Sequence, residues 1–401
     1  MIYRRIVTSV LGASLTLCAY ALENDSIVAV VDTAVVDTAS VVKAERGRRF
    51  GGFIGKIVDY FKQSNVPKRH KGLDFSIIGG PHYSSDTKLG LGLVAAGQYY
   101  SGTPADTTTL MSNISLTGDV TTGGFYKVGI GGNHYSAGNR WRIDYKVDFY
   151  QFLRKFWGIG YSRGENVDDY TKFKELFIEC RADFMRNLGH NFYAGPTVAF
   201  DHAKANDVKC EELWDGQRLS TYTTAVGLKL LYDSRDNLTA TQRGWMMSLS
   251  QRFSPRFLGN HYAFISTELM ASGFWKGWKD AIICAHFHTL FNYAGSVPWA
   301  KMATFGGSDS MRGYYEGRFR DKCAADVVLE LRQHVWRRHG VVLWVGAGSV
   351  FDKPQHLRLN RILPNGGIGY RWEFKKRTNV RLDFGIGRGE TSFIFNINEA
   401  F

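Results

Sequence analysis

Apolar and polar residues alternate with a period of two along most of the chain from Gly72 onward. The alternation is clearest in residues 141–150, where one set of positions is apolar and the other mainly charged: Trp141, Ile143, Tyr145, Val147 and Phe149 against Arg142, Asp144, Lys146, Asp148 and Tyr150. Residues 175–184 and 326–332 repeat the pattern. Because successive side chains of a strand point to opposite faces, the pattern predicts strands with one apolar and one polar face.

The same period predicts sixteen strands in all. We expect them at 72–80, 88–100, 110–119, 123–134, 140–151, 172–186, 190–202, 220–233, 243–253, 261–273, 280–291, 324–336, 340–351, 364–374, 378–387 and 391–401. An even number puts both ends of a barrel on one side of a membrane, here expected to be the periplasmic side. The long connections 152–171, 203–219, 292–323 and 352–363 then all fall on the external side. The short ones at 187–189, 337–339 and 375–377 fall on the periplasmic side, as outer-membrane barrels show.

This alternation favours a membrane barrel over a soluble sandwich, whose apolar faces point inward. The apolar strands continue for over three hundred residues without a helical layer to cover them. Several reach about ten residues, the length that a tilted strand needs to cross a bilayer. The predicted fold class is therefore all-β: a 16-stranded antiparallel transmembrane β-barrel over residues 72–401, with its apolar side toward lipid and its polar side toward the lumen.

The first 71 residues differ from the rest. Residues 1–21 are a basic start, an apolar run and the small-x-small site Ala19-Tyr20-Ala21, which predicts a signal peptide and export to the outer membrane. A lipoprotein signal would acylate Cys18, but Leu17 stands where a small residue is expected. Residues 22–71 are expected to be a periplasmic linker with a short amphipathic helix at 51–64. That helix fits an interfacial anchor and a packed core helix equally well.

The amino-acid composition agrees with the predicted all-β fold. The 27 Phe, 20 Tyr, 10 Trp and 44 Gly residues suit strands, tight turns and interfacial belts. A net charge of +13 on an exported chain argues against a nucleic-acid partner, and it fits either ordinary surface solvation or contact with outer-membrane lipid or lipopolysaccharide. Five cysteines are too few for a disulfide scaffold, although Cys210 and Cys323 lie in or beside external connections and a bridge between them stays open.

Several motifs occur in the order found in one family of barrels. The connection before the twelfth strand contains Phe305 to Tyr314, with Gly306, Gly307, Arg312, Gly313 and Tyr314 in a Gly-rich Arg-Gly-aromatic loop. Tyr232 to Asn237, with Asp233, Arg235 and Asp236, forms a turn motif between the eighth and ninth strands. Residues 330–332, 367–371 and 381–385 match later strands, and the chain ends on Phe401. Over residues 72–401 the sequence resembles the BamA/TamA superfamily of outer-membrane barrels (the bacterial surface antigen family).

The resemblance implies that the Gly-rich connection folds into the lumen and that Arg312 pins it to an acidic wall residue. It also implies that Phe401 is a C-terminal insertion signal. The family often carries an aromatic-x-Asp on the thirteenth strand, but this chain has Trp344 followed by Gly346 at the acidic position. By strand parity Glu330 and Asp326 face the lumen, so both are candidate partners of Arg312.

A second departure concerns the periplasmic polypeptide-transport (POTRA) repeats that family members usually carry. Residues 22–71 are too short for one, so the sequence predicts a member lacking these repeats. Periplasmic or lipoprotein partners are then expected to replace them.

The function implied by the resemblance is assembly or insertion of outer-membrane proteins, or translocation of secreted clients, through the lumen loop and a lateral seam between the first and last strands. The first strand runs into Gly79-Gly80-Pro81, which weakens pairing there. A stable closed seam and a passive, porin-like diffusion channel are the alternatives. A hydrolase has no local motif to support it, so no enzyme activity or cofactor is expected. No metal site is expected either, because His286 and His288 share one strand face without a third ligand and are predicted to be solvated lumen residues.

Overall fold

The computed structural model describes residues 74–84, 88–103, 106, 109–238, 240–304, 306–375 and 377–401. The predicted signal peptide, linker and amphipathic helix lie outside the described residues, as does Phe305. Within the part of the chain that the structure describes, no helix combines the length and the apolarity required to traverse a bilayer.

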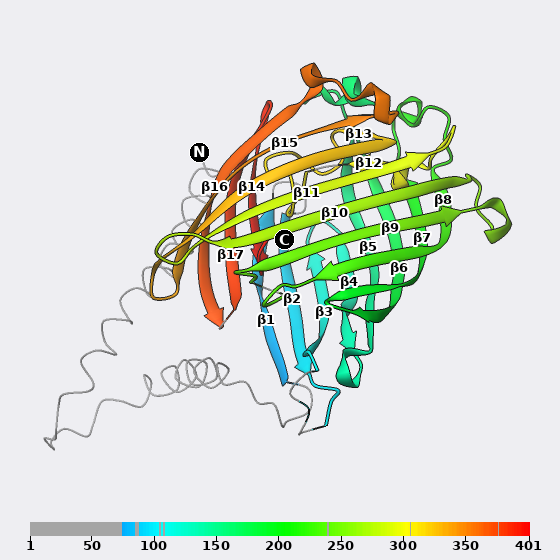
Figure 1. The fold of residues 1–401 in the computed structure, drawn as a ribbon. Coiled ribbons are helices and arrows are strands. Elements are labelled where there is room, and N and C mark those ends of the chain that lie inside the picture. The colour runs from blue at the N-terminus through cyan, green and yellow to red at the C-terminus, as the bar shows by residue number, and fades with distance from the viewer. Residues whose placement is uncertain are drawn as a thin grey trace, which may run out of the picture. The chain divides into compact units, whose positions relative to one another are not determined.

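Sixteen strands form one antiparallel sheet in which neighbours follow chain order, except that β11 pairs with β14. Their bounds are β1 (Asp74–Ser84), β2 (Lys88–Tyr99), β3 (Ser112–Thr121), β4 (Tyr126–Tyr135), β5 (Trp141–Phe156), β6 (Thr171–Gly189), β7 (Phe192–Asn206), β8 (Ser220–Asp233), β9 (Gly244–Ser254), β10 (Phe264–Lys276), β11 (Ala281–Tyr293), β14 (Cys323–Trp336), β15 (His339–Phe351), β16 (Leu363–Lys375), β17 (Thr378–Gly387) and β18 (Glu390–Ile397). The sheet curls around an interior, which we call the lumen (Figure 1).

Shorter elements lie in the connections. Strands β12 (Ala303–Thr304) and β13 (Arg320–Asp321) pair only with each other. Single 3₁₀ turns are η2 (Ala137–Asn139), η3 (Tyr161–Gly164), η4 (Glu211–Trp214), η5 (Arg256–Leu258), η6 (Trp299–Lys301), η7 (Pro354–His356) and η8 (Leu359–Arg361).

All sixteen predicted strands are present, and most bounds differ by a few residues. The first strand does not end at Gly80: β1 continues through Pro81, which pairs with Leu91, to Ser84. An edge strand tolerates proline because its outer side has no partner that needs the missing N–H group. The last strand is shorter than predicted, because β18 ends at Ile397 and Asn398 takes a positive φ of 71°.

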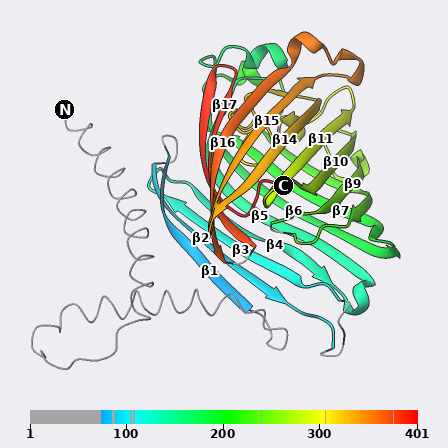
Figure 2. The ribbon, with the colours of Figure 1, turned by 60° about the vertical axis from the view of Figure 1, so that its left-hand side comes forward.

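The described sheet is not closed by pairing of its first and last strands. Among the described residues β1 pairs with β2 alone and β18 with β17 alone (Figures 1 and 2). Closure would need the last strand to run alongside β1, and the inward turn at Asn398 takes residues 398–401 away from that edge.

Side-chain burial confirms which face of each strand is apolar. On β5 the polar residues Arg142 and Asp148 are buried, whereas Trp141, Val147 and Phe149 are exposed. Exposed large apolar side chains occur on nearly every strand of the sheet, as a lipid-facing surface requires and a water-facing one rarely shows. The polar lumen face and the apolar outer face therefore match the predicted barrel.

Connections differ in length between the two ends of the sheet. The long ones at 157–170, 207–219, 294–322 and 352–362 gather at one end, the upper one in Figure 1. At the opposite end β6–β7 and β14–β15 are joined by two residues each. The connection 294–322, which we call the lumen loop, extends inward and reaches the inner wall formed by β14 to β17.

Candidate functional site

Glycines let the lumen loop rest directly on the wall. Gly306, Gly307 and Gly313 have φ values of 103°, 88° and 123°, a left-handed region that glycine adopts without strain and that lets the chain turn tightly. A Cβ atom on Gly313 would lie 2.7 Å from the main-chain carbon of Ile386 on β17. At Gly385 it would lie 2.6 Å from the Arg312 carbonyl oxygen. The tip of the loop therefore packs directly against main-chain atoms of β17.

Arg312 is the centre of this contact and is fully buried. Its Nη1 donates to Asp383 Oδ2 at 2.7 Å, and its Nη2 donates to Glu330 Oε2. The guanidinium carbon lies 3.9 Å from the ring centroid of Trp344, a cation–π contact. Asn365 Nδ2 donates to the Arg312 carbonyl oxygen at 2.9 Å. Two carboxylates from different strands thus hold one planar cation, which fixes the loop tip in position and direction.

Of the two predicted partners of Arg312, Glu330 is confirmed and Asp326 is wrong. Asp326 accepts a hydrogen bond from Ser310 Oγ, and its Oδ1 lies 3.3 Å from His288 Nδ1. Asp383 was not predicted to pair with Arg312, although it lies within the family motif at residues 381–385. The signal was its parity: Arg381, Asp383 and Gly385 alternate on one face, as lumen residues must.

The family often has an acidic residue at the position of Gly346. In this protein, side chains from neighbouring strands take the place of that residue. A Cβ atom at Gly346 would collide with the side chain of Asn365, which occupies that space and binds the Arg312 main chain. The second negative charge comes from Asp383 on β17 instead. The loop arginine therefore keeps two carboxylates without an acidic residue on β15.

Further ion pairs extend from Arg312 into what we call the arginine–carboxylate cluster: Arg312, Arg332, Arg371, Arg381, Glu330, Asp383 and Glu399. Arg332 Nε donates to Glu330 Oε1 at 2.6 Å, and Arg371 Nη1 donates to Asp383 Oδ1 at 2.5 Å. Arg381 Nε lies 3.7 Å from Asp383 Oδ2. Each carboxylate that holds Arg312 thus also holds a wall arginine.

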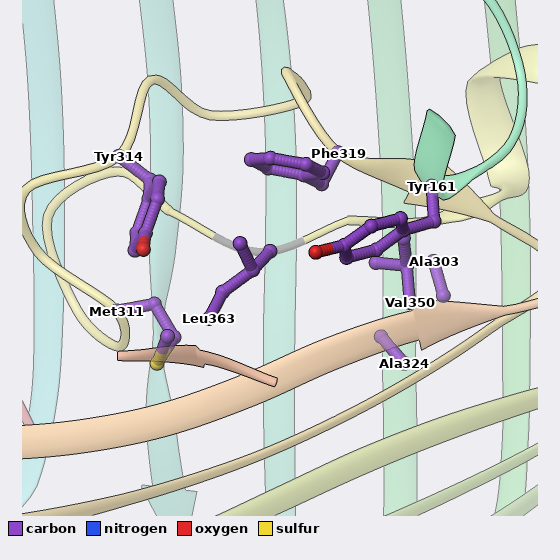
Figure 3. Close-up of a cluster of buried hydrophobic side chains, with 8 residues drawn as sticks. All are labelled: Tyr161, Ala303, Met311, Tyr314, Phe319, Ala324, Val350 and Leu363. Atoms are coloured by element: carbon purple, nitrogen blue, oxygen red, sulfur yellow. The ribbon is translucent and has the colours of Figure 1, made fainter. Parts of the chain in front are cut away.

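Tyr314 fixes the loop just past the arginine, as the motif implied. Its hydroxyl donates to the Pro364 carbonyl oxygen at 2.6 Å and accepts from the Arg388 main-chain N–H at 2.8 Å. Figure 3 shows Tyr314 gathered with Met311 and Phe319 of the loop around Leu363 of the wall. A buried apolar cluster therefore supports the polar contacts of the loop tip.

The turn motif between β8 and β9 links distant parts of the sheet. Asp233 Oδ2 accepts from Arg142 Nη1 on β5 and from Arg235 Nη2, both at 2.8 Å. Asp236 Oδ2 accepts from Arg377 Nη1, in the β16–β17 connection, at 3.0 Å. The turn is thus tied to β5 by Asp233 and to the last strands by Asp236.

The electrostatic environment of Asp236 favours its charged form. Burial alone would raise its pKa, but the main-chain N–H groups of Gln242 and Arg243 and the Arg377 guanidinium outweigh burial and hold the pKa of Asp236 below its usual range. The carboxylate is therefore the form that holds the turn closed.

Phe401 lies in the lumen, and not at the end of a wall strand as predicted. Its ring stacks on His286 with centroids 4.6 Å apart, and its main-chain oxygen accepts from Arg332 Nη2 at 3.2 Å. His286 is buried and bonded to Ser272 Oγ at 2.8 Å, so the expectation of a solvated histidine is wrong for this residue. The role of Phe401 as an insertion signal stays a prediction.

Two further candidates from the sequence are a metal site and a disulfide bridge. Among the described residues no group of three or more His, Cys, Asp and Glu side chains has metal-binding geometry. Cys210 is exposed and Cys323 is buried, and both are free thiols, so the open question of a bridge is answered against it.

The curled antiparallel sheet, its apolar exterior and its internally pinned loop define an outer-membrane β-barrel with a lumen loop. The Omp85 superfamily domain matches residues 125–400, and the chain belongs to this superfamily. Family and fold together indicate an integral protein of the bacterial outer membrane with a role in protein assembly or translocation.

Two solved structures show the same fold at low sequence identity. One is BamA from Haemophilus ducreyi lacking POTRA domains 1–3, with a TM-score of 0.53, 12% identity and coverage of 80% of this chain and 69% of that chain. The other is CdiB from Acinetobacter baumannii, with a TM-score of 0.50, 11% identity and coverage of 82% and 59%. No curated protein matches the sequence significantly.

Proposed function

We propose that this protein inserts client proteins into the outer membrane, or passes them across it, by using the pinned lumen loop and the free edges of its sheet. The observation that carries the proposal is the burial of Arg312 between Glu330 and Asp383. Burying a cation and two anions costs desolvation energy that a plain surface turn avoids. This energetic cost is expected where a fixed position of the loop is required for function.

The free edges supply the second half of the mechanism. Within the described sheet, β1 has β2 as its one strand neighbour and β18 has β17. Such edges accept an added strand by main-chain hydrogen bonding. An incoming client strand would pair there, and the client would leave sideways into lipid.

Partners follow from the same proposal. The clients are outer-membrane or secreted proteins, and the apolar exterior contacts lipid, with lipopolysaccharide on the external side. Periplasmic or lipoprotein partners would deliver clients in place of POTRA repeats. The mechanism needs strand pairing and loop movement, and it involves no enzyme chemistry and no cofactor.

A disulfide lock tests the seam. Cysteine pairs scanned across β1 (residues 74–84) and β18 (residues 390–397) should abolish client insertion when oxidised and restore it when reduced. The matched control is a pair at Leu230 and Leu249, which face each other on β8 and β9 inside the sheet. Oxidation of the control pair should leave insertion unchanged. Full activity of an oxidised seam-locked protein would refute lateral opening.

A further inference from the structure

Residues 398–401 leave the sheet and occupy a pocket in the lumen wall. After Ile397 the positive φ of Asn398 turns the chain, and the Asn398 main-chain N–H donates to the Asn379 carbonyl oxygen at 2.7 Å. The Glu399 side chain is 4% exposed and Ala400 is 8% exposed. The segment is therefore bound inside the curled sheet.

Glu399 is held by donors from three strands. Its Oε2 accepts from Arg371 Nε at 2.9 Å and lies 3.6 Å from Arg332 Nε. Its Oε1 accepts from Asn379 Nδ2 at 2.6 Å. These donors come from β16, β14 and β17, so the wall itself forms an anion site of defined geometry.

Phe401 fills the apolar half of the same pocket. It lies between the ring of His286 and the Arg332 guanidinium, whose central carbon is 5.4 Å from the ring centroid. The ring also packs against a buried cluster on β14 and β15, formed by Val328, Val342 and Trp344. An acidic residue and an aromatic residue two positions later thus meet two complementary sites on one surface.

The charge balance of the lumen depends on this occupant. Arg332 and Arg371 also bind Glu330 and Asp383, the two carboxylates that hold Arg312. Without Glu399, Arg332 and Arg371 would share Glu330 and Asp383 with Arg312, since the further acidic neighbour Asp309 lies beside Arg381, 3.9 Å from its Nη2. Arg332 Nη1 and Arg371 Nη2 are buried and already lack a hydrogen-bond partner. Uncompensated buried charge is strongly destabilising, so the pocket requires an anion.

We propose that this pocket, formed by Arg332, Arg371, Asn379, His286 and Phe274, is a binding site for acidic-x-aromatic peptide segments. Residues 399–401 are its resident ligand, and a client segment with the same chemistry replaces them. Departure of the resident segment frees residues 398–401 to extend β18, and the incoming carboxylate keeps Arg332 and Arg371 paired. The pocket deepens the proposed function by naming what the lumen recognises, and it relies on that function only for the identity of the client.

Cys284 is a natural reporter for occupancy of the pocket. It is fully buried on β11, opposite Phe274 on β10 and Glu330 on β14 in the strand register. Phe274 lies beside the resident segment, with its ring centroid 6.4 Å from that of Phe401. Glu330 accepts from Arg332 Nε, which also lies 3.6 Å from Glu399 Oε2. Removal of the segment should therefore expose this thiol to alkylating reagents.

The experiment measures alkylation of Cys284 by N-ethylmaleimide in the full-length folded protein, resolved from the other cysteines by peptide mass spectrometry. Glu399→Gln combined with Phe401→Ala should raise the alkylation rate about tenfold or more, because the segment then opens readily. The single variants Glu399→Gln and Phe401→Leu, which keep most of the packing, should give smaller increases. Phe393→Ala, on the exposed outer face of β18, is the matched control and should leave the rate unchanged.

A peptide added in trans then tests recognition. A synthetic peptide with the sequence of residues 396–401 should restore protection of Cys284 in the double variant. The same peptide with Gln for Glu and Ala for Phe should not. The proposal is overturned if Cys284 stays protected in the double variant, or if both peptides protect it equally. Neither readout involves client insertion, so failure here is distinguishable from failure of the proposed function.

Discussion

At the scale of single residues, geometry at Arg312 decides how the lumen loop is held. A guanidinium presents several N–H donors that point in different directions within one plane, and here Nη1 donates to Asp383 and Nη2 to Glu330. A lysine offers one compact charge and cannot reach both carboxylates in this way. The absence of a side chain at Gly385 makes room for the loop, since a side chain there would collide with the Arg312 carbonyl oxygen.

Replacing Arg312 with alanine should destabilise the protein by about 3–5 kcal/mol, because two buried carboxylates lose their shared cation. Arg312→Lys should recover only part of this loss. The measurement is the free energy of unfolding in urea for protein folded into lipid vesicles. Arg358→Ala, at an exposed position in the connection between β15 and β16, is the control and should change stability by less than about 0.5 kcal/mol. An equally small effect at Arg312 would contradict the buried pin.

Gly385→Ala should dislodge the loop tip, because the new Cβ atom would lie 2.6 Å from the Arg312 carbonyl oxygen. The expected result is faster cleavage of the lumen loop by an added protease. Gly118→Ala on β3 is the matched control, since a Cβ atom there meets nothing within 4 Å. Equal cleavage rates for the two variants would show that the loop does not rest on β17.

At the scale of elements, the β8–β9 turn and the segment after β18 act as ties between strands that are far apart in the sequence. The turn reaches β5 through Asp233 and the β16–β17 connection through Asp236. The segment 398–401 joins β14, β16 and β17 through Glu399. A sheet with two free edges gains few restraints from strand pairing at those edges, so such ties help to hold its curvature.

Acid should loosen the β8–β9 turn. The folded pKa of Asp236 lies below its unfolded value, so its contribution to stability is present above the unfolded pKa of about 3.9 and is lost as the pH falls through the folded pKa. The difference in thermal unfolding midpoint between the unmodified protein and Asp236→Asn should therefore be largest near neutral pH and vanish in acid. Glu212→Gln, at an exposed position in the connection between β7 and β8, should show no such difference. A difference independent of pH would contradict this role of Asp236.

At the scale of the whole molecule, the loop and the sheet edges distinguish an assembly barrel from a diffusion channel. A porin needs an open aqueous lumen, whereas here the lumen loop crosses to the β14–β17 wall and is fixed there by buried contacts. The free edges at β1 and β18 have no use in a passive channel, which is most stable when fully closed.

Single-channel recording separates these functions. The unmodified protein should show a low, fluctuating conductance, and Arg312→Ala should raise it by releasing the loop. Arg358→Ala serves again as the exposed control. A large and steady conductance in the unmodified protein would favour the porin-like alternative.

The strands could be predicted from the amino-acid sequence, because a two-residue period is a local property that each strand carries. The sixteen strands, the exposure of the apolar face and the glycine turns of the loop were all predictable. Parity also identified Glu330 as a lumen residue that Arg312 could pair with.

Which lumen residues contact one another follows from the three-dimensional fold and could not be predicted from strand periodicity. Asp326 and Glu330 have the same parity, and the path of the loop alone brings Arg312 to Glu330 and Asp383 and leaves Asp326 to Ser310. The inward turn of residues 398–401 was likewise hidden, because their pattern continues that of β18 while their partners lie on strands far away in the sequence. Local periodicity specifies faces, but contacts across the lumen depend on how the sheet curls.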